Sequence, residues 1–178
     1  MALSLTNRTI LSAFIFLGLF MSAYAKNNTS KDEKNLLTVS RTLHPDFALK
    51  VAKAALLNCR KGGYQVTVVV VDNGGNIQVT LRDQLAGILT PKAAFLKAQT
   101  AISFRTNTST LTTDAISSKR NAEIRNLPGI LLLGGGVTIK AGGSTIGAVG
   151  VSGAPSGKID EKCAEAGIAT IKESLDFL

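Results

Sequence analysis

The chain has 178 residues and a formal net charge of +8, with one histidine, two cysteines and no tryptophan. This length suits a single domain with a proper core. Its basic residues form no stripe interleaved with aromatic residues, which argues against nucleic-acid binding, and two cysteines with a single histidine exclude the usual tetrahedral zinc sites.

Residues 1–25 predict a cleavable signal peptide. A polar start with Arg8 precedes the apolar run Ile10–Phe20, and the small residues Ala23 and Ala25 follow it. The run is shorter than the roughly 20 apolar residues of a membrane-spanning helix. We therefore expect a periplasmic or secreted protein, with no stable membrane insertion after cleavage. The alternative is an uncleaved anchor.

Polar residues dominate the stretch after the cleavage point, so we expect a flexible mature N-terminus over 26–40 and one domain over 41–178. The sequence His44-Pro45-Asp46 predicts the start of a helix that runs to about Lys61. Two glycines then end it, and we expect the first, Gly62, to be left-handed.

The next segments predict a hairpin and a second helix. A valine-rich strand over 64–72 and a partner over 77–82 flank the turn residues 73–76, which suit an antiparallel hairpin. Thr90 reads as the N-cap of a helix that ends near Phe104. The polar stretch 105–126 predicts a loop with a short helix over 114–125.

The C-terminal part predicts an antiparallel meander and a last helix. Short apolar runs over 130–133, 137–140 and 145–151 are separated by glycines, and a helix follows over 159–175. Gly147, Gly150 and Gly153 recur every third residue, which suggests a close approach by another element or by a ligand. Five mainly antiparallel strands flanked by helices give an α+β fold.

Few side chains offer chemistry. His44 is the only histidine, so it is the candidate axial ligand of a haem iron; the alternative is an exposed helix-start residue. A polar cluster at the rim of the sheet could contain Arg82, Asp83 and Lys97, or these residues could form simple surface salt bridges. No nucleophile elbow and no phosphate-binding loop is present, so an enzyme is less favoured than a binding protein.

Export would place Cys59 and Cys163 in an oxidising compartment, where a disulfide is permitted. Two buried free thiols are the alternative.

Five motifs in order resemble the GlcG/HbpS haem-binding-protein family. They are Val70-Val71-Asp72-x-Gly-Gly, Leu81-Arg82-Asp83-x-x-Ala86-Gly87, Lys97-Ala98-x-Thr100-Ala101, Gly134-Gly135-Gly136, and the run from Gly147 to Pro155. The likeness extends from about Thr42 to Asp176, and the stretch around Cys163 resembles an exported subgroup. Where that subgroup often has Pro-His-Thr, this chain has Ile88-Leu89-Thr90.

The resemblance implies a profilin-like α/β/α sandwich and a homo-oligomer. It also implies that the first and last helices lie together, which favours a Cys59–Cys163 disulfide. For function it implies binding of heme or a related tetrapyrrole, with His44 as metal ligand and with Arg82 and Lys97 as partners of ligand carboxylates. A sensor or uptake protein of the cell envelope is the implied partner. The alternative function is a non-catalytic extracytoplasmic sensor or assembly module without a cofactor.

Overall fold

The computed structural model describes residues 38–117 and 119–176. The predicted signal peptide and most of the predicted flexible N-terminus lie outside these ranges. Arg41–Leu178 form one compact unit, and the description below concerns that unit.

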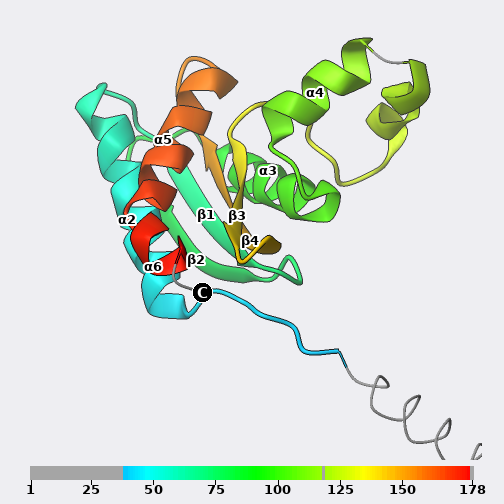
Figure 1. The fold of residues 1–178 in the computed structure, drawn as a ribbon. Helices are drawn as coiled ribbons and strands as arrows, with labels where there is room; N and C mark the ends of the chain where they lie inside the picture. Colours follow the sequence, from blue (N-terminus) through cyan, green and yellow to red (C-terminus); the bar gives the residue numbers. More distant parts are fainter. Residues whose placement is uncertain (1–37, 118, 177–178) are drawn as a thin grey trace, which may run out of the picture. The chain divides into compact units, whose positions relative to one another are not determined.

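A four-stranded antiparallel sheet forms the centre of the unit, with the strand order β2-β1-β4-β3 (Figure 1). Each strand pairs antiparallel with its neighbours, and the central β1–β4 pair is made by strands far apart in the sequence. The strands are β1 (Thr67–Asp72), β2 (Ile77–Arg82), β3 (Gly136–Ala141) and β4 (Ser144–Ser152).

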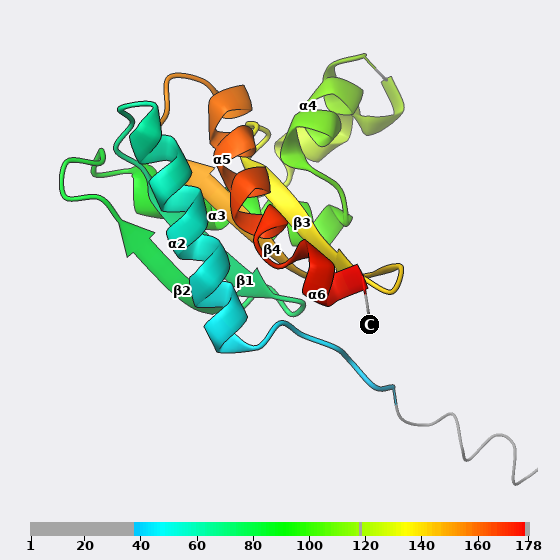
Figure 2. The same cartoon turned by 60° about the vertical axis from the view of Figure 1, so that its left-hand side comes forward.

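Helices cover both faces of this sheet. The helices α2 and α5 lie side by side on one face, and α3 lies on the other (Figure 2). The α/β/α sandwich expected from the sequence is therefore confirmed. The helices are α2 (Pro45–Lys61), α3 (Thr90–Phe104), α4 (Thr108–Ser117), the 3-10 helix η2 (Lys119–Asn126), α5 (Gly157–Ala169) and α6 (Lys172–Asp176).

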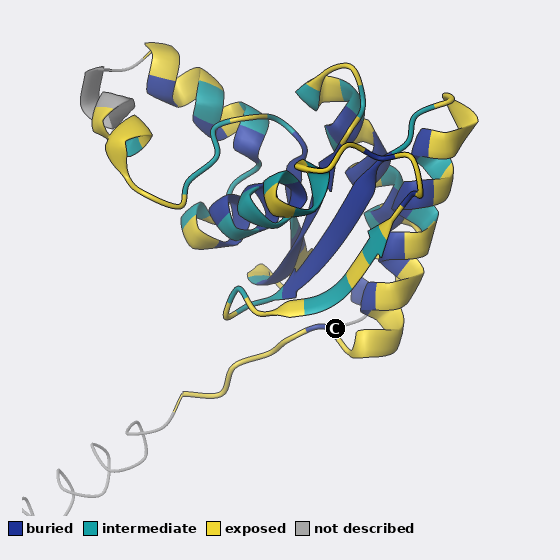
Figure 3. Ribbon diagram, turned by 180° about the vertical axis from the view of Figure 1, so that it is seen from behind, coloured by how far each residue is buried: buried dark blue, intermediate teal, exposed yellow. Residues whose placement is uncertain are grey.

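The valine run of β1 explains why both faces are covered. Successive side chains of a strand point to opposite faces. Val68 and Val70 belong to the core shared with α2 and α5, whereas Val69 and Val71 pack with α3. Figure 3 shows the inner strands buried and the outer helix faces exposed. A strand that is apolar on both faces can only be central.

The sequence predicted five strands, and the described residues contain four. The missing one is the segment 130–133. The Leu131 amide donates to Thr100 Oγ1 at 3.0 Å, and the Leu133 amide donates to the Leu131 carbonyl at 3.0 Å. These amides are occupied by a helix side chain and a local turn, so the segment does not join the β-ladder.

Two helix predictions also need correction. The helix expected over 159–175 is two helices, because Thr170 ends α5 and its hydroxyl donates to the Gly167 carbonyl at 2.7 Å. Ile171 then enters the core. In the middle of the chain, α4 begins at Thr108, earlier than expected, and ends at Ser117 instead of continuing to 125.

Two caps differ in detail from the prediction. Gly63, with φ of 78°, is the left-handed residue after α2, and Gly62 has a φ of −85°. Thr90 is the first residue of α3, and the N-cap residue of that helix is Leu89. The Thr90 hydroxyl donates to the Gly87 carbonyl at 2.7 Å, so it closes the preceding turn instead of capping the helix.

The glycines spaced three apart mark close approaches by other backbone segments. A Cβ atom on Gly150 would lie 1.9 Å from the Ala94 carbonyl oxygen of α3, which is overlap. Cβ atoms on Gly147 and Gly153 would each lie 2.6 Å from a carbonyl oxygen, of Val71 and Gln65 respectively. Other elements, not a ligand, therefore account for this spacing.

Candidate functional site

His44 lies at the start of α2 as its N-cap residue. Its Nδ1 accepts a hydrogen bond from the Asp46 amide at 3.3 Å, and its side chain is 68% exposed. This is the capping role that Asn, Asp, Ser or Thr usually fills. The imidazole is accessible, but the structure places it on the surface.

Arg82, at the end of β2, is exposed, and its guanidinium donates to the Ala86 carbonyl. The next residue, Asp83, is buried. One Asp83 oxygen accepts from Arg60 Nε at 2.7 Å, and the other accepts from the Val66 amide at 3.0 Å. Arg82 therefore closes the β2–α3 loop on itself, and Asp83 holds that loop against the end of α2 and the residue before β1.

Lys97 is fully buried in the middle of α3, with a relative exposure of 0%. Its Nζ lies 2.7 Å from Asp160 Oδ2 and 2.9 Å from the Val151 carbonyl oxygen. Burial raises the pKa of the Asp160 carboxyl, and the hydrogen bond and charge of Lys97 oppose that rise. The ammonium is thus engaged by protein groups and is not presented to a surface ligand. The rim cluster expected around Arg82 and Lys97 does not form.

Cys59 and Cys163 form a disulfide that joins α2 to α5. Their Cα atoms are 5.5 Å apart, and both side chains are buried. The bridge spans 104 positions in the sequence. The pairing implied by the family resemblance is therefore present in the structure.

The candidate site is a groove between α4 and α5, here called the α4–α5 groove. Its volume is about 540 Å³, within the usual range for small-molecule sites. Two of its lining residues, Gly134 and Gly157, are in close backbone contact, because a Cβ on Gly157 would lie 2.7 Å from the Gly134 carbonyl oxygen. The lining residues are Ser109, Thr112, Leu133, Gly134, Gly157, Lys158, Glu161, Lys162 and Glu165.

The charged side chains of the α4–α5 groove differ in whether they contact other protein groups. Glu161 Oε1 accepts from Ser109 Oγ at 2.7 Å and from Asn107 Nδ2 at 3.2 Å, so this carboxylate fastens α5 to the start of α4. Lys158 and Lys162 are exposed, and none of the three ion pairs found among the described residues uses them. Lys158 lies in the first turn of α5, where the helix N-terminus favours anions, and Lys162 lies one turn further along the helix.

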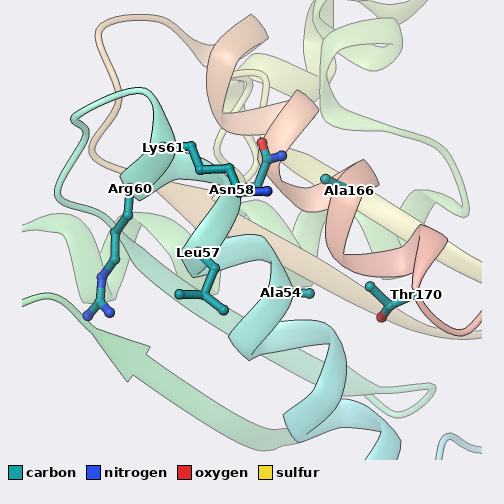
Figure 4. A pocket seen from close by; sticks show the side chains of 7 residues that line it. All are labelled: Ala54, Leu57, Asn58, Arg60, Lys61, Ala166 and Thr170. Carbon is teal, nitrogen blue, oxygen red and sulfur yellow. The ribbon is translucent and has the colours of Figure 1, made fainter.

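A second groove, the α2–α5 groove, lies on the outer side of the two helices. Figure 4 shows its lining of Ala54, Leu57, Asn58, Arg60 and Lys61 from α2, with Ala166 and Thr170 from α5. Its volume is about 550 Å³. One of its two cations, Arg60, is already committed to Asp83. The α4–α5 groove therefore offers more free polar groups for a charged ligand.

Neither groove is lined by His44, Arg82 or Lys97. Within residues 38–117 and 119–176, no group of three or more His, Cys, Asp or Glu side chains is gathered as a metal site would require. Over the same ranges, no helix has the length and apolar character needed to cross a membrane.

Comparison with known proteins agrees with the fold. Residues 43–169 match the model of a family described as haem degrading protein HbpS-like. The chain belongs to the HbpS-like family. An uncharacterized 15.0 kDa protein in the dhaT-dhaS intergenic region of Citrobacter freundii is 34% identical over 109 residues, which are 60% of this chain and 76% of that protein.

Two solved structures in the comparison carry further information. A double mutant of Streptomyces reticuli HbpS is 39% identical with a TM-score of 0.72, over 77% of this chain and 92% of that one. A complex of PduOC with heme is 27% identical with a TM-score of 0.66, over 73% of this chain and 95% of that one.

Sequence reasoning did not single out Lys158, Lys162, Ser109 or Thr112 as site residues. Two signals pointed toward the groove. The run Gly134–Gly136 is one of the motifs of the family resemblance, and Glu161 lies near the start of the helix predicted over 159–175. Neither signal shows that α4 packs beside the start of this helix, so the groove could not be foreseen.

Proposed function

We propose that the mature chain is an exported, oligomeric protein that binds heme or a related tetrapyrrole in the α4–α5 groove. Membership of the HbpS-like family carries the proposal, together with the heme complex of the related PduOC. The groove is assigned on its chemistry, because it combines two exposed lysines, which form no ion pair among the described residues, with the apolar side chain of Leu133.

The residues of the α4–α5 groove fit such a ligand. Heme is a flat apolar ring with two carboxylates, and Lys158 and Lys162 can each form a charge-assisted hydrogen bond with a carboxylate. Leu133, which is 47% exposed, offers an apolar surface to the ring. Bound heme would supply redox and oxygen chemistry through its iron. The protein residues would hold the ring and neutralise its carboxylates.

The iron ligand separates two versions of this proposal. The groove offers hydroxyl and carboxylate oxygens from Ser109, Thr112 and Glu165. His44 lies at the start of α2, outside the groove lining. Binding in the groove predicts that His44→Ala leaves the Soret spectrum of bound heme unchanged. A spectrum altered by that substitution would assign the iron to His44 instead.

A hemin titration of the chain from residue 26 onward tests the site. We expect a saturable Soret shift in the unaltered protein. In Lys158→Glu/Lys162→Glu we expect about tenfold weaker binding, equivalent to about 1.4 kcal/mol. The double variant Lys50→Glu/Lys53→Glu, at exposed positions of α2, has the same charge change and should bind normally. If both double variants bind hemin equally weakly, the loss reflects the net charge of the protein and not a specific site in the α4–α5 groove.

One observation favours the alternative of an assembly module without a cofactor. The loop between β2 and α3 exposes three apolar side chains, Leu85, Ile88 and Leu89, at 76%, 89% and 72%. Neighbouring exposed apolar residues often mark a protein interface. If the hemin titration gives no saturable spectral change, the heme-binding proposal fails and the assembly module without a cofactor replaces it.

A further inference from the structure

The buried pair Lys97–Asp160 adjoins the α4–α5 groove, because Asp160 directly precedes the lining residue Glu161. Both side chains are buried, at 0% and 3% exposure, and their charged atoms are 2.7 Å apart. Burying two charges costs free energy that an apolar pair of similar size would not cost. Stability alone therefore does not explain why a lysine and an aspartate occupy these two buried positions. Their other contacts indicate a further role.

Each charged group holds a second segment of backbone. Asp160 Oδ1 accepts from the Ala154 amide at 3.0 Å, which fixes the loop before α5. Lys97 Nζ donates to the Val151 carbonyl at 2.9 Å, which fixes the end of β4. The pair thus connects α3, β4, the loop after β4 and the first turn of α5.

The side chains of the same pair lie in close contact with Gly135 of the glycine run. A Cβ on Gly135 would lie 2.7 Å from the Asp160 Cβ and 3.0 Å from Lys97 Nζ. The neighbouring Gly134 meets Gly157, and both line the groove. A shift of Asp160 would therefore affect the glycine run beside the groove and, through the first turn of α5, the position of Lys158.

We infer that Lys97 and Asp160 are positioning residues for the α4–α5 groove: they hold the first turn of α5 and the glycine run in the arrangement that accepts the ligand. This inference rests on the proposed function for the ligand, but the positioning of α5 can be measured without any ligand.

The test removes the charges together. Lys97→Met or Asp160→Asn alone leaves a buried charge unpaired, which destabilises the fold strongly. The double variant Lys97→Met/Asp160→Asn leaves no charge, and the carboxamide oxygen that it introduces can still accept from the Ala154 amide. Its Tm should therefore return to within about 4 °C of the unaltered protein. The rate of amide hydrogen exchange in the first turn of α5, the hemin Kd and the Tm are then measured for the double variant and for the unaltered protein.

We expect exchange over residues 156–162 to be at least tenfold faster in the double variant, with α2 unchanged. Hemin Kd should rise about tenfold if the competent arrangement falls to about a tenth of the molecules. The core variant Val51→Ala is the control for general destabilisation, and its faster exchange should not be confined to the first turn of α5.

Two results would overturn the inference. One is unaltered exchange and affinity in the double variant, and the other is faster exchange spread evenly over α2 and α5. If the unaltered protein binds no hemin, the proposed function fails. The exchange pattern then still decides whether the pair positions α5.

Discussion

Asp72 closes the β1–β2 hairpin with a single carboxylate. Its Oδ1 accepts from the Gly74 amide at 2.9 Å and from the Asn76 amide at 2.8 Å. Burial acts to raise the pKa of Asp72, but the hydrogen bonds from Asn76 and from the amides of Gly74 and Gly75 outweigh it. They hold that pKa below its ordinary value.

This pKa shift predicts a pH-dependent contribution to stability. A carboxyl whose pKa is lower in the folded state stabilises the fold above its unfolded pKa of about 3.9. The contribution is lost as the pH falls through the folded pKa. Asp72→Asn should therefore cost about 1 kcal/mol at pH 7.

Urea unfolding of both proteins at neutral and acidic pH measures the difference. We expect the gap in unfolding free energy between the unaltered protein and the Asp72→Asn variant to narrow as the pH falls below about 4. Asp114→Asn, at an exposed position of α4, is the control and should change stability by less than about 0.5 kcal/mol. A gap that is constant with pH would contradict the role of the charge.

Gly150 is required by the contact between α3 and β4. Because a Cβ there would overlap the Ala94 carbonyl oxygen at 1.9 Å, Gly150→Ala must push α3 away from the sheet. We expect a loss of about 3 kcal/mol, measured as a lower urea midpoint.

Gly87→Ala is a matched control for that substitution. Its Cβ would meet Thr90 Cγ2 at 3.5 Å, an ordinary contact, and its φ is not positive. Its stability should therefore stay within about 0.5 kcal/mol of the unaltered protein. Similar losses at the two positions would mean that the contact with α3 is not the cause.

Among the elements, α2 and α5 form one layer that the disulfide holds together. Cross-linking mainly restricts the unfolded chain, and the effect grows with the length of the closed loop. The 104-residue separation of Cys59 and Cys163 is long. Cys59→Ala/Cys163→Ala should therefore lower the free energy of unfolding by about 3–5 kcal/mol.

Guanidinium unfolding without reductant measures this loss. The unaltered protein with reductant present is the comparison, and it should lose a similar amount once the bridge opens. If the double alanine variant is as stable as the oxidised protein, the layer of α2 and α5 is held by packing alone. The core contacts of Val51, Ala52 and Ala55 would then be sufficient.

At the scale of the whole molecule, export is a prediction from residues 1–25, which lie outside the described ranges. Expression of the full chain in a Gram-negative host should yield periplasmic protein whose N-terminal residue is Lys26. Intact mass and N-terminal sequencing measure this. Protein that keeps residues 1–25 and stays in the membrane fraction would favour the uncleaved anchor.

Homo-oligomer formation is also a property of the whole molecule. If the exposed loop between β2 and α3 is part of the interface, replacing its apolar residues removes buried apolar area from the assembly. We expect Leu85→Ser/Ile88→Ser/Leu89→Ser to shift native mass spectra toward the monomer. The variant Leu49→Ser, at an exposed position of α2, is the control. A monomeric unaltered protein would refute the oligomer itself.

Local sequence patterns predict several elements of this fold. The valine run predicts a central strand, Asn73–Asn76 predict the hairpin, and Pro45 marks a helix start. These predictions succeed because strand alternation, turn chemistry and proline geometry depend on residues close together in the chain. The segment 130–133 shows the limit, because its amides donate to Thr100 Oγ1 and to a local turn instead of to a neighbouring strand.

The candidate site was decided by tertiary structure. The sequence predicted Lys97 at the rim of the sheet, but Lys97 is buried and pairs with Asp160, 63 positions away. The α4–α5 groove likewise exists because Ser109 and Asn107 contact Glu161 across more than 50 positions. Sequence by itself determined the elements, their faces and the family resemblance. Which charges are buried, and which stay free for a ligand, depended on long-range partners that no local pattern specifies.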